Sequence, residues 1–167
     1  MANTLLSGLM VTIFSLALGG CAVARGPLFD ASTLPALTGD TARIILFRQS
    51  APGGFGAGSS IPVKLDGQDF AEFPQLGYAW RDVPAGRHEL SASRPGWWAG
   101  RARLVLDLSA GATGYVEVSH SGAAVASVFA PVAAVTATDS ETGGPYSLVL
   151  TDPARAVSAL SKCRRTH

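Results

Sequence analysis

The chain has 167 residues, and its 13 lysines and arginines nearly balance its 12 aspartates and glutamates, for a net charge of +1. This balance argues against a nucleic-acid-binding protein, which carries a basic excess. Two cysteines are too few for a disulfide framework, so the fold must depend on a hydrophobic core. Glycine and proline are spread along the whole chain, a distribution typical of many short strands joined by tight turns.

The first element is an uncharged, apolar stretch from Leu5 to Leu18, followed by Gly19-Gly20-Cys21. A membrane-spanning helix needs about 20 apolar residues, so this stretch instead has the length of the hydrophobic region of a signal peptide. Small residues directly before a cysteine resemble the lipobox of bacterial lipoproteins. The resemblance implies that Cys21 is lipidated and becomes the first residue of the mature protein. We therefore predict a lipoprotein signal peptide over residues 1–20.

Two other interpretations of this region are open. Ala22-Val23-Ala24 is an A-x-A-like site, and ordinary cleavage after Ala24 would release a soluble periplasmic protein. A buried N-terminal helix is less favoured, because it should have a polar and an apolar face. Residues 1–4 lack the usual Lys or Arg of a signal peptide. By resemblance to Gram-negative lipoproteins, Ala22 after the cysteine implies the outer membrane, facing the periplasm.

Residues 21–40 are predicted to be a tether, because they are rich in glycine and proline and have no sustained period. Four apolar residues within it can also pack against the domain: Leu28, Phe29, Leu34 and Leu37. A lipidated Cys21 cannot form a disulfide. Cys163 is therefore expected to be a free thiol or a site of intermolecular pairing.

From residue 41 to 151 the pattern predicts one β-sandwich domain. Alternating or apolar β-prone segments predict strands over residues 42–48, 61–65, 77–83, 88–93, 101–108, 113–119 and 146–150. Asp66-Gly67 predicts a two-residue hairpin turn, and the three-residue spacing of Phe70 and Phe73 predicts a bulge in the returning strand. Residues 123–138, interrupted by Pro131, predict an edge strand or two short strands, followed by a polar loop over 139–144.

The last predicted element, within residues 152–167, is a short helix with a basic tail. Asp152 and Pro153 are typical of a helix start, and Val157 and Leu160 are its expected apolar anchors. The tail cations are predicted either to stay solvated near the helix end or to contact anionic lipid. About seven or eight strands with short connections and one terminal helix predict an all-β antiparallel sandwich.

Four segments in chain order resemble one domain family. They are Ala42-Arg43-Ile44-Ile45-Leu46-Phe47-Arg48, Val63-Lys64-Leu65-Asp66-Gly67, Asp82-Val83-Pro84-Ala85-Gly86-Arg87-His88 and Ala110-Gly111 with Tyr115-Val116. Together they resemble the DUF2846-type domain of bacterial lipoproteins and small exported proteins, over residues 41–161. The resemblance implies a β-sandwich in a lipoprotein setting and no assigned activity. The glycine-rich loop at 51–60 and the apolar region at 123–138 depart from the pattern.

Trp97 and Trp98 form a candidate binding surface. They lie on a loop bounded by proline and glycine, with Arg94 and Arg101 close in sequence, and tryptophan with arginine is enriched in binding hot spots. The partner is expected to be an envelope protein; a second hypothesis is a carbohydrate, the cell-wall polymer peptidoglycan, stacked on the two rings. The alternative, and the commoner case for large rings, is that they fold back over the core.

Motifs for catalysis or metal binding are not found in the sequence. His88 and Glu89 are strand neighbours and point to opposite faces, and His120 has no ligand spacing around it. Ser119-His120-Ser121 lacks a nucleophile elbow, and the glycine-rich run at 54–59 is not followed by a phosphate-binding helix. We therefore predict no metal, no cofactor and no enzyme, but an interaction or structural module of the cell envelope.

Overall fold

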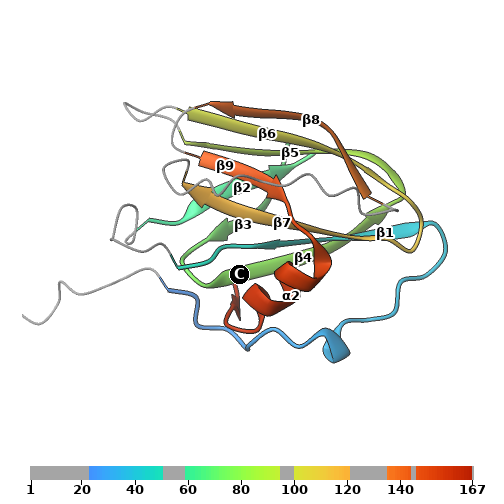
Figure 1. Cartoon of the computed structure of the whole chain (residues 1–167), viewed down its shortest axis with the longest axis horizontal. Coiled ribbons are helices and arrows are strands. Elements are labelled where there is room, and N and C mark those ends of the chain that lie inside the picture. Colours follow the sequence, from blue (N-terminus) through green and yellow to red (C-terminus); the bar gives the residue numbers. More distant parts are fainter. Residues whose placement is uncertain (1–22, 51–58, 95–99, 121–134, 144–145, 167) are drawn as a thin grey trace, which may run out of the picture.

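Two five-stranded sheets face each other in the computed structural model, and their strands run along the long axis of the molecule (Figure 1). The structure describes residues 23–50, 59–94, 100–120, 135–143 and 146–166. The predicted all-β sandwich with one short C-terminal helix is confirmed. The predicted signal peptide and Cys21 lie outside the described residues.

The first sheet has the strand order β10-β4-β1-β7-β9. Its strands are β1 (Thr41–Phe47), β4 (Gly77–Pro84), β7 (Thr113–His120), β9 (Tyr146–Leu150) and β10 (Arg164–Arg165). The central strand β1 pairs antiparallel with β4 and parallel with β7, and β10 pairs parallel with β4. Parallel neighbours need a long crossover, which strands of the second sheet supply between β1 and β7. The sandwich is therefore mostly, not wholly, antiparallel.

The second sheet has the order β3-β2-β5-β6-β8, and all its pairs are antiparallel. Its strands are β2 (Ile61–Leu65), β3 (Gln68–Phe73), β5 (Gly86–Arg94), β6 (Gly100–Leu108) and β8 (Val135–Gly143). Asp66 and Gly67 both have positive φ, 51° and 80°, as the predicted hairpin turn requires. The predicted bulge is also present, because the β2–β3 pairing passes from Asp69 to Ala71 and leaves out Phe70.

The main core lies between the sheets and follows the alternation seen in the sequence. The inward side chains of β6 are all buried: Ala102, Leu104, Leu106 and Leu108. Those of β1 in the same cluster are Ala42, Ile44 and Leu46. Burial of each large aliphatic side chain contributes about 1.5–3 kcal/mol, so this layer is the main source of stability.

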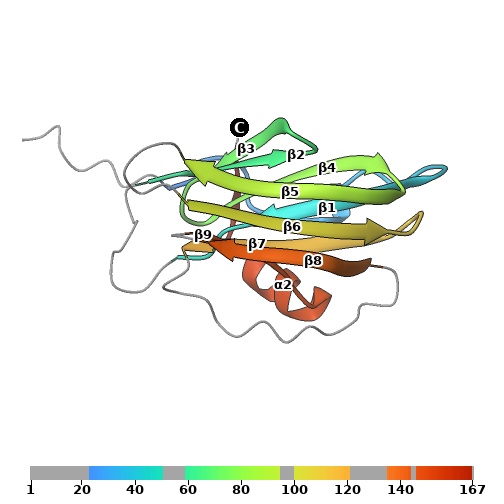
Figure 2. The same ribbon diagram turned by 90° about the horizontal axis from the view of Figure 1, so that it is seen from above.

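A second apolar cluster lies on the outer face of the first sheet, where α2 (Pro153–Leu160) packs. Its fully buried sheet residues are Ile45 and Phe47, and it is covered by Leu160 and, in part, by Phe29. Because β1 has apolar neighbours on both faces, its sequence is a continuous apolar run instead of an alternation. Figure 2 shows α2 outside the two layers of strands.

Two predictions about the C-terminal third of the chain were wrong. Residues 139–143 were expected to be a polar loop but belong to β8. β8 lies at the edge of its sheet and is held by backbone pairing with β6, which polar side chains do not prevent. Val157 is 44% exposed, and Ala156 and Leu160 are the buried anchors because a four-residue spacing keeps them on one helix face. The tail cations are exposed close to the end of the helix, as expected, but Arg164–Arg165 also form the short strand β10, which the sequence did not indicate.

Candidate functional site

Many strand ends meet at one end of the sandwich, which we call the Gln75 end. In the first sheet β1 ends there, β4 begins, and His120 of β7 pairs with Tyr146 of β9. In the second sheet Ile61 pairs with Phe73, and Arg94 pairs with Gly100. The described chain also begins at this end, on the side of Figure 1 where β7 and β8 finish.

The segment expected to be a tether is joined to the Gln75 end from its first described residue. Val23 forms a parallel bridge with Gln75, and the amide of Ala24 donates to the Gln75 carbonyl at 3.2 Å. Ala24 is only 6% exposed. The segment then continues beside β10, where Leu28 bridges Arg164. Residues 23–28 are therefore bonded to the sandwich.

Further along, the same segment packs on the outer apolar cluster. The ring of Phe29 lies edge-on to Tyr78, with ring centroids 5.2 Å apart, and Leu34 also contacts the cluster. Leu28 points outward and is 51% exposed. Gly26 lies so close to the Arg165 carbonyl that a Cβ atom would overlap it. A glycine is thus required where the segment crosses β10.

At the Gln75 end, the side chain of Arg48 contacts residues of several strands. Its side chain is fully buried, and Nη1 donates to the carbonyl oxygens of Ser59 at 2.5 Å and Phe73 at 2.9 Å. Nη2 lies 3.4 Å from Nδ1 of His120, whose ring packs 5.5 Å from Tyr146. Burial lowers the pKa of Arg48, and the nearby Tyr146 opposes this shift. The arrangement suits a structural clamp that holds β1, β3 and β7 together.

Gln75 carries a buried polar group at the same end. Its Oε1 accepts a hydrogen bond from Ser50 Oγ at 3.4 Å, whereas its Nε2 has no partner among the residues that the structure describes. A buried donor without a partner costs about 1–3 kcal/mol. The backbone of Gln75 is the part that receives the N-terminal segment.

Of the predicted binding residues, Trp97 and Trp98 lie outside the described residues, as does the lipidation candidate Cys21. Arg94 ends β5, and nothing is described of its side chain. Arg101 is exposed near the start of β6. The register places the backbone of both arginines at the Gln75 end.

His88 has a structural environment. Its Nδ1 lies 2.7 Å from Asp66 Oδ2, and its Nε2 lies 2.8 Å from the Pro84 carbonyl, so the ring ties the β2–β3 turn to the end of β4. Glu89 instead accepts a hydrogen bond from Arg103 Nε at 2.8 Å. Within the described part of the chain, no group of three His, Cys, Asp or Glu side chains is placed to hold a metal ion.

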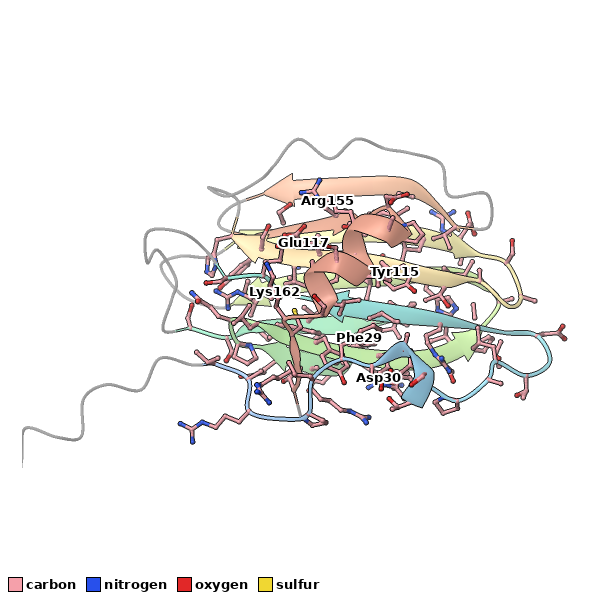
Figure 3. All side chains as sticks on the ribbon, turned by 60° about the horizontal axis from the view of Figure 1, so that its bottom comes forward. Phe29, Asp30, Tyr115, Glu117, Arg155 and Lys162 are labelled. Atoms are coloured by element: carbon pink, nitrogen blue, oxygen red, sulfur yellow. The ribbon has the colours of Figure 1, made fainter. Side chains whose placement is uncertain are left out.

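Figure 3 looks onto the outer face of the first sheet, where α2 crosses the strands. Phe29 and Asp30 lie on the N-terminal segment beside it, and Tyr115 lies next to the helix. Burial raises the pKa of Tyr115, an effect opposed by the positive charge of Arg43. The hydroxyl therefore stays protonated in this packed layer, which is a second core and not an open site.

Cys163 belongs to this second core as a buried free thiol. Its Sγ lies 3.5 Å from the Ala159 carbonyl and 3.8 Å from the Arg48 carbonyl. Burial raises its pKa to about 11, with a smaller contribution from Glu117. A thiol in this state is a poor nucleophile, so intermolecular pairing would require the helix to move first.

Comparison of the chain with protein-family models, with curated proteins and with solved structures finds no match. The resemblance to the DUF2846-type domain therefore stays a prediction. No helix in the described part of the chain is long and apolar enough to cross a membrane.

Proposed function

We propose that this chain is a lipoprotein of a bacterial cell envelope, anchored through Cys21. Its β-sandwich serves there as a non-enzymatic interaction or structural module. The run Leu18-Gly19-Gly20-Cys21 carries the anchoring hypothesis. The interaction role is the simplest one for a sandwich whose described residues form closed cores and structural clamps.

The attachment of Ala24 favours cleavage before Cys21 over cleavage after Ala24. Cleavage before Cys21 leaves both the Val23–Gln75 bridge and the Ala24–Gln75 hydrogen bond in the mature protein. Cleavage after Ala24 would remove these contacts and the buried side chain of Ala24. The contacts of Val23 and Ala24 that cleavage before Cys21 retains support the lipoprotein route.

Labelled fatty acid incorporation tests the proposal. The full chain is expressed in a Gram-negative bacterium that is fed labelled palmitate, beside the variants Cys21→Ser and Cys163→Ser. We expect label in the wild type and in Cys163→Ser, and none in Cys21→Ser. Label in Cys21→Ser, or no label in the wild type, would contradict lipid anchoring at Cys21.

The binding partner is proposed to be another envelope component, either a protein or peptidoglycan. Crosslinking of the anchored protein in intact cells tests this part. The variant Trp97→Ala/Trp98→Ala is compared with wild type, and a pull-down on purified peptidoglycan runs in parallel. Loss of a specific crosslinked protein in the double variant supports a protein partner, and loss of peptidoglycan binding supports the carbohydrate-binding alternative. No difference in either assay contradicts a role for the two tryptophans.

A further inference from the structure

The distance between Cys21 and the folded sandwich is short. Ala22 is the one residue between Cys21 and Val23, and Val23 is already paired with Gln75. Consecutive Cα atoms are about 3.8 Å apart, so the Cα of Cys21 lies within roughly 8 Å of the Cα of Val23. A lipid on Cys21 would therefore bring the Gln75 end close to the bilayer surface, because only Ala22 separates the lipidated residue from the paired Val23.

Exposed cations gather at this same end. Four of them come from three parts of the chain: Arg25, Arg101, and Lys162 with Arg164. Arg164 pairs with Gly77 at the start of β4, and Figure 3 shows Lys162 beyond the end of α2. Two carboxylates lie nearby, Glu72 and Glu117, and Gln49 donates a hydrogen bond to the second at 2.9 Å. The described side chains therefore give this end a positive balance.

Acidic side chains lie toward the opposite end. Asp40 precedes β1 and is exposed. Asp66 is exposed in the β2–β3 turn, and Asp107 lies opposite Arg87 where β5 begins and β6 finishes. Lys64, which pairs with Asp69, and Arg87 are also exposed at this end. The described charges of this end are therefore acidic by a small margin, although the whole chain is nearly neutral.

We propose that the Gln75 end rests on the anionic headgroups of the membrane and that the sandwich stands on this end, with its acidic end in the periplasm. This orientation rests on the proposed anchoring at Cys21. Each basic residue near an anionic surface strengthens binding about fivefold, and the effect decays over a Debye length of about 8 Å. Arg25 follows Cys21 by four residues, at most about 14 Å of extended chain, and the same seating brings Arg164 toward the headgroups.

Fluorescence quenching by a headgroup-attached quencher tests the orientation. The lipidated protein is reconstituted in vesicles of phosphatidylcholine and phosphatidylglycerol, with a thiol-reactive fluorophore at Ser93→Cys or at Asp40→Cys. Ser93 is exposed and pairs with Arg101 at the Gln75 end, and Asp40 is exposed at the other end. Cys163 is buried and remains unlabelled. We expect several-fold stronger quenching at position 93, and equal or reversed quenching overturns the proposal.

Charge variants test the cause of the orientation. Arg25→Gln/Lys162→Gln/Arg164→Gln removes three cations from the Gln75 end. The matched control, Lys64→Gln/Arg87→Gln/Arg155→Gln, removes three exposed cations elsewhere. The quenching ratio is the quenching at position 93 divided by the quenching at position 40. We expect the first variant to bring this ratio close to one and the control to leave it unchanged. If both variants leave the ratio unchanged, attraction of these cations to the headgroups does not orient the sandwich, and this part of the proposal is overturned.

Mass spectrometry of the same samples separates the two proposals. Protein without lipid on Cys21 refutes the anchor and the orientation together. Protein with lipid but without a quenching difference refutes the orientation alone and leaves the anchor standing.

Discussion

Arg43 and Asp82 face each other across the β1–β4 ladder and form a two-point ion pair. Nε donates to Oδ1 at 2.6 Å and Nη2 donates to Oδ2 at 2.9 Å. Nη2 also donates to the Pro35 carbonyl at 2.8 Å, and the guanidinium lies 4.7 Å from the Trp80 ring centroid. Arg43 is only 5% exposed, whereas the Asp82 side chain is 31% exposed, so a buried guanidinium joins the N-terminal segment to the sheet through a partly exposed carboxylate.

Removing the carboxylate is expected to destabilise the fold. Asp82→Ala leaves the buried Arg43 charge with the Pro35 carbonyl and the Trp80 ring, and we expect a loss of about 2–3 kcal/mol in the free energy of unfolding. The matched control is Asp69→Ala, which breaks the exposed pair with Lys64 at 3.4 Å and should cost less than about 1 kcal/mol. Urea unfolding measures both, and equal losses would contradict the buried role of Arg43.

The N-terminal segment is expected to contribute to stability. Phe29→Ala removes the edge-on contact with Tyr78 and should lower the free energy of unfolding by about 1–2 kcal/mol, less than for a fully buried ring. Leu28→Ala changes an outward-facing neighbour and should cost less than about 0.5 kcal/mol. Limited proteolysis should cut residues 23–40 faster in Phe29→Ala. A free tether would give no difference between the two variants.

Cys163 is expected to be chemically silent in the folded protein. With a pKa raised to about 11, its thiolate fraction at pH 8 is about a hundredfold below that of an ordinary cysteine. Labelling by iodoacetamide, followed by mass spectrometry, should therefore be slow until denaturant is added. Rapid labelling of the native protein would show that α2 leaves the sheet readily.

The same thiol gives a pH dependence with a defined sign. A group whose pKa is raised in the folded state contributes stability that is complete below its unfolded pKa and is lost as the pH rises through the folded value. The free energy of unfolding should thus fall between about pH 9 and about pH 11. Tyr78 and Tyr115, whose pKa values are also raised by burial, act in the same direction at high pH. Cys163→Ala isolates the thiol, and an unchanged slope in this variant would contradict the assignment.

The Asp66 side chain is expected to hold the β2–β3 turn through two hydrogen bonds. Oδ1 accepts from the Glu89 amide at 2.9 Å, and Oδ2 lies 2.7 Å from His88 Nδ1. Asp66→Asn should cost about 1 kcal/mol. Asp66→Ala should cost about 2 kcal/mol, because alanine also disfavours the positive φ. Thermal unfolding measures both variants, and a lower melting temperature for Asp66→Asn than for Asp66→Ala would contradict this role of Asp66.

Much of the sandwich could be predicted from local patterns. The Asp66-Gly67 turn has few conformations available and was found where expected. The bulge at Phe70 followed from a break in alternation. The helix start at Asp152 followed from capping, and its side chain accepts from the amides of Ala154 and Arg155.

The remaining features depend on contacts between distant segments, which local patterns do not encode. β10 has only two residues and no period, and it exists because the Leu76 carbonyl accepts the Arg164 amide at 2.7 Å. The bonds of Arg48 to the carbonyls of Ser59, before β2, and Phe73, at the end of β3, likewise join segments that are far apart in sequence. The docking of Ala24 on Gln75 was missed for the same reason, because a segment rich in glycine and proline has the composition of a free tether.

The central claim is that the mature protein begins with a lipidated Cys21, one residue before the chain joins the sandwich at Val23. Intact mass spectrometry of the protein purified from bacterial membranes, with sequencing of its N-terminal peptide, tests this directly. We predict a chain that begins at Cys21 and carries the added mass of acyl chains. A soluble chain that begins at Arg25 without added mass would contradict the anchor, and with it the proposed seating of the Gln75 end on the membrane.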